Sequence, residues 1–196
     1  MEQEILHLLR ELEEFGESND EEAEDRSQKM LNITHDTGVF LALLIKISGA
    51  QKILEIGTSN GYSTLWLAHT VGEQGLVTTI ELDPHKIAMA EKNFEASGLQ
   101  SRIQQIAGDA GSFFKTCQDG EFDFIFLDSN RSQYEEWWHS LQQIVKPGGL
   151  LVVDNAVSHQ EQIADFAERV SLSKGYLTSL VPIGKGELVI LKEIVN

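Results

Sequence analysis

The chain has 196 residues, of which 41% are hydrophobic and 23% are charged. This length and composition predict a single globular domain, and no apolar run approaches the roughly 20 residues that a membrane-spanning helix needs. The N-terminus lacks a basic segment followed by an apolar segment and a cleavage site, which predicts an unprocessed cytoplasmic protein. The single cysteine, Cys117, excludes an internal disulfide, and no Cys/His spacing suits a zinc site.

Charge is unevenly distributed, because 15 Lys and Arg face 31 Asp and Glu for a net charge of −16. Residues 1–25 hold eleven acids and one base, Arg10, which leaves −6 for residues 26–196. Binding a nucleic-acid backbone relies on clustered Lys and Arg, and the sequence has no basic run. A DNA or tRNA partner is therefore disfavoured, and a small-molecule substrate is expected.

An amphipathic helix is predicted over residues 1–15, where apolar residues recur at helical spacing: Ile5, Leu8, Leu9, Leu12 and Phe15. An acidic hinge completes an N-terminal arm of residues 1–27, and residues 28–196 form the single predicted domain. That domain opens with a second helix or helix pair over residues 28–48, which residues 37–38 (Thr-Gly) interrupt.

Short apolar strands then alternate with helices, which predicts an α/β fold with a mostly parallel sheet and helices on both faces. The predicted strands are 52–56, 76–81, 102–107, 122–128 and 149–154. The predicted helices are 62–72, 84–97, 110–117, 131–144 and 159–172, the fourth being stopped by the sequence KPGG at 146–149. Two last strands are joined too tightly for a crossover, so they add an antiparallel hairpin and bring the sheet to seven strands.

The first strand runs into a glycine-bearing turn that opens a helix, where a doubly wound sheet binds its cofactor. Gly57 and Gly61 have the spacing G-x-x-x-G, whereas dinucleotide sites use G-x-G-x-x-G, so NAD is the weaker interpretation. Glu55, Ser59 and Ser63 suit a ligand with an amino-acid head better than one with two phosphates.

Acids also end the next two strands. Glu81 lies 24 residues after Gly57 and can accept both hydroxyl hydrogens of a ribose. The turn that carries Asp109 and Ala110 can face an adenine edge. Taken singly, Glu81 could be a solvated strand end and Asp109 a helix N-cap. Together, ribose, adenine and amino-acid recognition at three successive strand ends predict S-adenosylmethionine.

Five segments, taken in order, resemble the motifs of the cation-dependent class I O-methyltransferases, the group of the catechol and caffeoyl-coenzyme A enzymes: ILEIGTSNGYSTLWLA, TTIELDP, IAGDA, FDFIFLDSNRSQY and GGLLVVDNAVSH. The resemblance covers about residues 28–194 and marks a short, bacterial-type member with a Rossmann-like class I methyltransferase fold. It implies an S-adenosylmethionine site lined by Leu31, Ile33, Glu55, Gly57, Ser63, Glu81 and Ala110. It also implies that Asp128, Asp154 and Asn155 hold a divalent cation.

The residue types and their positions also favour this cation site. Asp128 is expected to border the cofactor as well as to bind the cation. Asp128 closes one parallel strand, and Asp154 with Asn155 closes a neighbouring one, so three oxygen donors should meet at one edge of the sheet. Such donors favour Mg²⁺, with Mn²⁺ or Ca²⁺ as alternatives. Each side chain alone could instead be a helix cap.

Two features depart from the family. Residues 128–131 read DSNR where relatives have Asp-Ala-Asp-Lys, whose lysine serves as the base. Arg131 stays protonated and cannot be a general base, so we expect it to stabilise an oxyanion electrostatically. The chain also lacks the long substrate-capping insertion after Asn155, so catechol or caffeoyl specificity is not carried over. His159 is the candidate base, with a helix cap as its structural alternative.

The same helix carries adjacent tryptophans, Trp137 and Trp138, and we expect only one to face the core. The other would border the acceptor pocket or a subunit contact. His139 and Cys117 are interpreted as structural.

The predicted activity is methyl transfer from S-adenosylmethionine to an oxygen of a small hydroxylated acceptor, with an aromatic acceptor and a homodimer also considered. The alternatives are a tRNA-nucleoside O-methyltransferase and a non-catalytic S-adenosylmethionine-binding subunit.

Overall fold

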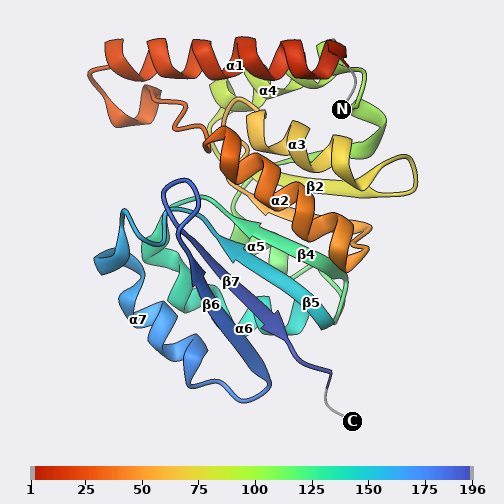
Figure 1. Ribbon diagram of the computed structural model, residues 1–196, viewed down its shortest axis with the longest axis vertical. Coiled ribbons are helices and arrows are strands. Elements are labelled where there is room, and N and C mark those ends of the chain that lie inside the picture. Colours follow the sequence, from red (N-terminus) through yellow and green to blue (C-terminus); the bar gives the residue numbers. More distant parts are fainter. Residues whose placement is uncertain (1–2, 195–196) are drawn as a thin grey trace.

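The computed structural model describes residues 3–194, which build one seven-stranded sheet of order β3-β2-β1-β4-β5-β7-β6 (Figure 1). The strands are β1 Lys52–Ile56, β2 Leu76–Glu81, β3 Ile103–Ala107, β4 Phe122–Leu127, β5 Val145–Val153, β6 Tyr176–Val181 and β7 Glu187–Lys192. The first five are parallel, and β7 runs antiparallel to both β5 and β6. The predicted fold class is confirmed.

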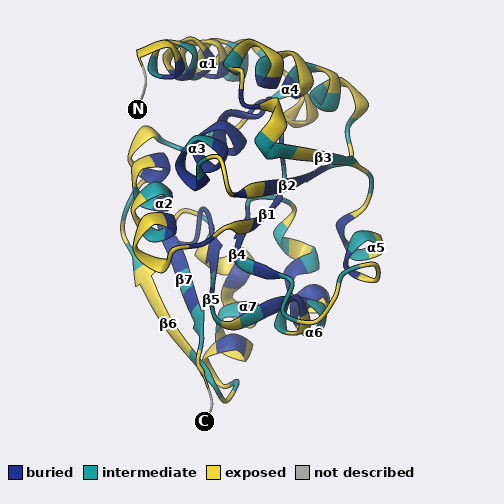
Figure 2. Cartoon of the chain, turned by 90° about the vertical axis from the view of Figure 1, so that its right-hand side faces the viewer, coloured by how far each residue is buried: buried dark blue, intermediate teal, exposed yellow. Residues whose placement is uncertain are grey.

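Helices cover both faces of the sheet, and their buried sides turn towards it (Figure 2). They are α1 Gln3–Glu22, α2 His35–Ser48, α3 Tyr62–Val71, α4 Pro84–Ser97, α5 Ala110–Phe114, α6 Tyr134–Ile144 and α7 Gln160–Ser171. Successive strand residues point to opposite faces, so Phe124 packs with α1–α4 while Ile125 packs with α5–α7. None of these helices combines the length and apolar character that crossing a bilayer requires.

The predicted hinge after residue 15 was placed too early, because α1 continues to Glu22. Its second half has little apolar periodicity and is held by polar contacts. Asn32 Nδ2 donates to Leu12 O at 3.0 Å, and Lys29 Nζ donates to Asp20 O at 2.6 Å. Such contacts between distant segments leave no periodic signal in the sequence.

Several other boundaries differ from the prediction, and two of them have a clear local cause. Thr37 and Gly38 do not interrupt a helix, since they lie in the first turn of α2, where Thr34 Oγ1 accepts a hydrogen bond from Thr37 N at 3.1 Å. Residues 146–149 lie within β5, which begins directly after α6 and contains a register irregularity against β4. The glycines there permit an extended, bulged strand and do not form a separate turn.

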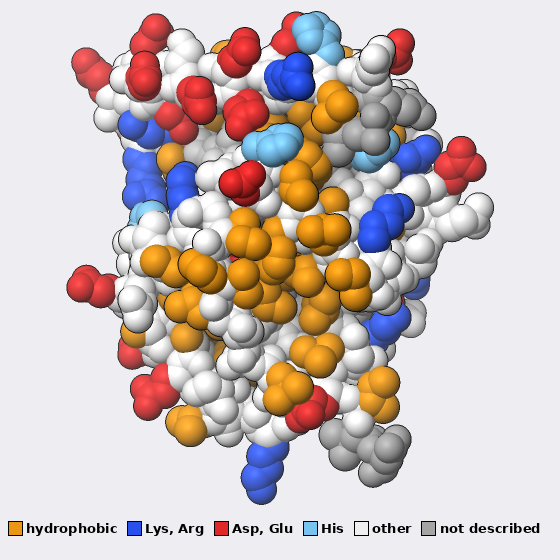
Figure 3. All heavy atoms as spheres, in the orientation of Figure 1, with side chains coloured by type: hydrophobic (Ala, Val, Ile, Leu, Met, Phe, Trp, Pro, Cys, Tyr) orange, Lys and Arg blue, Asp and Glu red, His pale blue; other side chains and the backbone are white. Residues whose placement is uncertain are grey.

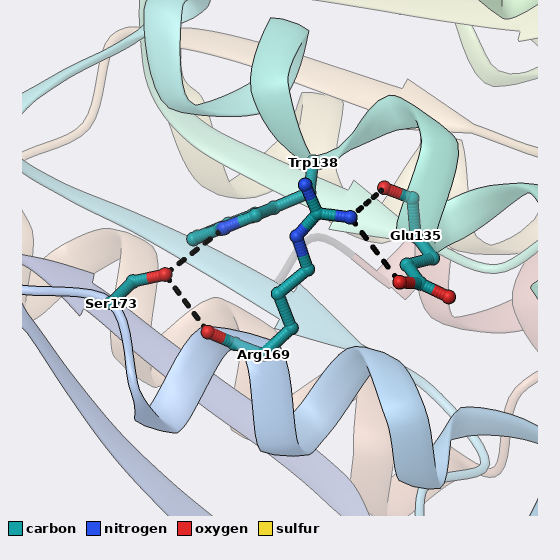
Figure 4. A network of polar contacts seen from close by, with 4 residues as sticks. All are labelled: Glu135, Trp138, Arg169 and Ser173. Carbon is teal, nitrogen blue, oxygen red and sulfur yellow. Dashed lines mark hydrogen bonds and ion pairs between the residues drawn. The ribbon is translucent and has the colours of Figure 1, made fainter.

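Trp137 and Trp138 are 7% and 2% exposed, so the expectation that only one of them faces the core is wrong. Trp137 does border the cavity described below, as was expected of one of the two. The α6 helix packs against α5, α7 and the sheet, so its buried side is wide enough for adjacent residues. Trp138 Nε1 donates to Ser173 Oγ at 3.2 Å, and Ser173 Oγ donates to Arg169 O at 2.9 Å (Figure 4). Arg169 also pairs with Glu135 at 3.2 Å, which ties α7 to α6.

Candidate active site

A cavity of about 970 Å³ opens beyond the carboxyl ends of the strands, where the strand order reverses between β1 and β4. In doubly wound sheets this reversal separates neighbouring loops and leaves room for a ligand. Most sequence-predicted site residues line it: Leu31, Ile33, Gly57, Ser59, Ser63, Glu81, Asp109, Ala110, Asp128, Arg131, Asn155 and His159. The structure does not bring Glu55, Gly61 or Asp154 to its wall.

Gly57 allows the loops after β1 and β4 to approach closely. Its φ is +106°, and a Cβ built on it would lie 2.0 Å from Asp128 O. Only glycine fits this contact. Gly61 serves a different purpose, because it is the left-handed N-cap of α3 and packs against Phe94.

Glu81 organises the turn beside the cavity. Its Oε2 accepts from Ser59 N at 2.9 Å, and its Oε1 accepts from Leu82 N at 2.8 Å and Asp83 N at 3.0 Å. A carboxylate has about four acceptor sites, so Glu81 keeps capacity for a ligand hydroxyl. Asp109 both lines the cavity and caps α5, since its Oδ1 accepts from Ser112 N at 2.8 Å.

A segment before α2 covers part of the cavity, and the contacts that hold it were missed from the sequence. Asp20 accepts from Met30 N at 2.6 Å and from Leu31 N at 2.8 Å, while Ser59 Oγ donates to Met30 O at 2.7 Å. Lys86 Nζ donates to Lys29 O at 2.8 Å. The acidic α1 therefore positions the predicted residues Leu31 and Ile33.

Glu55 lies under the cofactor turn and is fully buried, so its carboxylate does not face the cavity. It accepts hydrogen bonds from Ser63 Oγ at 2.5 Å, from Thr79 Oγ1 at 2.6 Å and from Thr64 Oγ1. Burial raises the pKa of Glu55 to about 7, against the lowering effect of these hydroxyls. Glu55 reaches the cavity wall only through Ser63.

Backbone strain is concentrated at the cavity. Among residues 3–194, the non-glycine residues with positive φ are Leu31 (54°), Ser59 (49°) and Asn155 (63°), and all three line the cavity. Residues held in this region cost about 1–3 kcal/mol each and cluster at functional sites. The strain therefore marks this cavity as a functional site.

Two carboxyl groups and an amide meet at the ends of β4 and β5. Asn155 Nδ2 donates to the Asp154 carboxylate and, at 3.5 Å, to Asp128 Oδ1. Burial and then the negative charge of Asp154 raise the pKa of Asp128 well above its ordinary value. Within residues 3–194, no three His, Cys, Asp or Glu side chains are grouped as metal ligands, so a cation here would depend on Asn155 as the third donor.

Glu187 is a further acid that sequence reasoning missed. It is fully buried at the start of β7, and its Oε1 accepts from Thr37 Oγ1 at 3.0 Å. Its Oε2 has no hydrogen-bond partner in the described part of the chain. Burial and then the charge of Asp154 raise the pKa of Glu187 to about 10. The available signal was an acid at the start of an otherwise apolar strand.

Arg131 and His159 line the same cavity as Asp128. Arg131 opens the 3-10 helix η3 (Arg131–Gln133), and its Nε is buried without a described hydrogen-bond partner. His159 Nδ1 lies 2.9 Å from Ser158 Oγ. Burial, followed by the positive charge of Arg131, lowers the pKa of His159 below its ordinary value. His159 therefore stays neutral to lower pH than a solvated histidine.

Comparison with known proteins places the chain in a family. Residues 5–175 match the family described as O-methyltransferase. A catechol O-methyltransferase of Niastella koreensis is 35% identical over 65% of this chain and 59% of its own length. One from Mycobacterium tuberculosis is 33% identical over 64% and 57%. The chain thus spans less than two thirds of these curated relatives.

The fold has solved counterparts. The O-methyltransferase from Bacillus cereus in complex with SAH has a TM-score of 0.80 at 24% identity, covering 95% of this chain and 91% of that one. Because the family match extends over most of the sequence, the chain belongs to the O-methyltransferase family.

Proposed function

We propose that this protein is a cytoplasmic, S-adenosylmethionine-dependent and divalent-cation-dependent O-methyltransferase, with a small hydroxylated aromatic acceptor in preference to a nucleic acid. One observation carries the proposal: most of the residues expected to hold the donor line a single cavity together with Asp128, Asn155, Arg131 and His159 of the acceptor side. Methyl transfer requires its two substrates in one aligned arrangement.

The donor side has the chemistry that S-adenosylmethionine needs. Glu81 retains acceptor capacity for one ribose hydroxyl, and Asp109 lies at the neighbouring strand end. A Cβ built on Gly108 would meet nothing within 4 Å, so the cavity is open where an adenine would lie. When bound, this cofactor supplies an electrophilic methyl group on its sulfonium.

The acceptor side fits a hard divalent cation, for which we propose Mg²⁺. Asp128, Asp154 and Asn155 present carboxylate and amide oxygens, the ligands this ion prefers. Asn155 Nδ2 donates to both buried carboxyl groups, and rotating the Asn155 amide by half a turn would present its oxygen to a cation. A bound cation supplies Lewis acidity, which lowers the pKa of an acceptor hydroxyl.

Arg131 and His159 supply the remaining chemistry. Arg131 cannot accept a proton, so its role is to stabilise the negative charge that develops on the acceptor oxygen. His159 is neutral above its lowered pKa and can accept the hydroxyl proton at Nε2. Alignment of the two substrates by the cavity wall supplies the rest of the rate increase.

The test is methyl transfer from S-adenosylmethionine to 3,4-dihydroxybenzoate, followed by mass spectrometry with Mg²⁺ or with EDTA. EDTA and Asp154→Ala should each reduce transfer at least about 100-fold by removing the electrostatic stabilisation. The matched control is Asp119→Ala, an exposed acid in the turn before β4, which should keep wild-type activity. Full activity in EDTA would remove the cation from the mechanism, and absence of transfer to any diol would refute the function.

We also propose that the protein is a homodimer. Figure 3 shows hydrophobic side chains gathered over the face that carries α2 and β6. Exposed members of this face are Val39, Leu43, Ile47, Leu177 and Leu180. The β6 strand is also an unpaired sheet edge, and a second copy would cover both features by two-fold symmetry. Sedimentation should give twice the chain mass, and Leu43→Glu with Leu180→Glu should give the monomer mass.

A further inference from the structure

Basic side chains gather around the cavity of this strongly acidic protein. The chain has 15 Lys and Arg, and a third of them line the cavity: Arg26, Lys29, Lys86, Arg131 and Lys185. Arg26 and Lys185 are exposed and the other three are partly buried, and four acids also line the cavity: Glu24, Glu81, Asp109 and Asp128. Five bases against four acids make this lining less acidic than the protein, whose net charge is −16. The cavity therefore carries a charge pattern unlike that of the molecule as a whole.

Two of these cations have structural partners. Lys29 Nζ donates to Asp20 O at 2.6 Å, and Lys86 Nζ donates to Lys29 O at 2.8 Å. Both bonds fix the segment that covers the donor side of the cavity. These lysines are therefore already used in holding the fold.

The other three cations are unpaired. The side chains of Arg26, Arg131 and Lys185 form no hydrogen bond or ion pair within residues 3–194, and Arg131 Nε is buried. Glu24 lines the same cavity without forming an ion pair with Arg26. Arg131 and Lys185 interact electrostatically with Asp128, yet neither forms an ion pair with it, so their N–H donors remain available for a ligand anion.

The three cations come from separate elements and reach one region of the cavity. Arg26 belongs to the 3-10 helix η1 (Arg26–Gln28), Arg131 begins η3, and Lys185 lies in the turn between β6 and β7. After burial, it is the positive charges of these three residues that lower the pKa of His159. All three charges therefore act on His159, which lines the same cavity on the side where we place the acceptor.

We propose that Arg26 and Lys185 bind an anionic group, a carboxylate or a phosphate, on the methyl acceptor, while Arg131 faces the acceptor oxygen. The inference rests on the proposed methyl transfer and narrows its substrate to an anionic hydroxylated compound. Arginine forks match both groups geometrically, and lysine adds a positive charge. Arg131 lies closest in sequence to Asp128, so it can contact the developing oxyanion while Arg26 and Lys185 hold the remote anionic group.

Calorimetry can test this with three diols that differ only in charge. The protein, saturated with S-adenosylhomocysteine and Mg²⁺, is titrated with 3,4-dihydroxybenzoate, catechol and 3,4-dihydroxybenzylamine. The benzoate should bind at least about tenfold more tightly than catechol, and the amine should bind most weakly. Raising NaCl from about 50 to about 300 mM should reduce the preference by screening. Competition by inorganic phosphate or by acetate distinguishes the two anionic groups.

The double variant Arg26→Gln/Lys185→Gln should lose the preference for benzoate while keeping its affinity for catechol. The matched control is Lys174→Gln, an exposed lysine before β6 that does not line the cavity, and it should keep the preference. Equal affinities in the wild type, no binding of any diol, or a preference that survives in the double variant would overturn the proposal. A preserved binding preference without methyl transfer to any diol supports the anion site and counts against the proposed function alone.

Discussion

Replacing Glu55 by glutamine tests the buried polar network under the cofactor turn. Three hydroxyls donate to this carboxylate, and no Lys, Arg or His within residues 3–194 forms an ion pair with it. Burial raises its pKa from 4.5 to about 7. Between these two pH values, the folded protein keeps a proton that the unfolded chain has released.

The difference between the folded and unfolded pKa values of Glu55 sets the direction and the size of the change in unfolding free energy with pH. The stability that Glu55 contributes is fully present below about pH 4.5, falls as pH rises and levels off above about pH 7. The two pKa values are about 2.5 pH units apart, which corresponds to about 3 kcal/mol in total. Glutamine does not titrate in this range. The unfolding free energy of the wild type, relative to Glu55→Gln, should therefore fall by about 2–3 kcal/mol between about pH 5 and pH 8.

Urea unfolding followed by tryptophan fluorescence measures this difference across the pH range. A second variant, Thr64→Val, removes a donor that favours the charged carboxylate, so the midpoint of the pH dependence should move upwards. A difference between wild type and Glu55→Gln that does not change with pH would show that Glu55 keeps one protonation state. That result would refute the argument from burial.

Substitutions at four other residues test the fold and the proposed mechanism. Gly57→Ala places a Cβ against Asp128 O at positive φ, and should lower the unfolding free energy by at least about 2 kcal/mol; an unchanged urea midpoint contradicts this. Trp138→Phe loses an indole hydrogen bond and packing, and should cost about 1–3 kcal/mol by the same assay. His159→Ala should abolish an acid limb of the pH–rate profile that lies below pH 6.5, since activity falls as His159 is protonated; a surviving limb removes His159 as the base. Arg131→Ala should lower kcat by about 10²-fold, whereas Arg131→Lys should stay within about tenfold; equal losses would contradict a charge-only role.

The sheet was predictable because its signal is local and repeated. The parallel strands are mostly apolar, and each ends at or just before a glycine or an acidic residue: Gly57, Glu81, Gly108, Asp128 and Asp154. Helices lie between them. That pattern also located the site, because the carboxyl ends of parallel strands share one edge. Glu81, Asp109 and Asp128 accordingly line one cavity although they are far apart in the sequence.

Side-chain direction was harder to predict than position. Glu55 lies two residues before Gly57 in the cofactor motif, yet it points with Ile53 towards the α3 side of the sheet. Strand alternation alone could have indicated this, because Leu54 and Ile56 face the opposite side. The motif located the cofactor turn correctly, while strand alternation determines which side chains of β1 can face the ligand.

Contacts between segments that are distant in the sequence left neither a periodic pattern nor a motif that could have predicted them. The second half of α1 depends on Asn32 and Lys29, and the burial of both tryptophans of α6 depends on the helices around it. Glu187 shows the same limit, because its environment is made by Thr37 and Asp154, which are remote in sequence. Tertiary packing overrode local propensity at each of these positions.

Several energetically unfavourable features lie together at one end of the sheet. Left-handed Leu31, Ser59 and Asn155, the raised pKa of Asp128, and the unpaired cations all lie at this cavity. Strain, buried acids and like charges each lower stability unless something compensates for them. A cation between the acids and an anion between the bases would relieve separate parts of this cost. Ligands that bind only the folded state raise its stability, so the site is built to be most stable when filled.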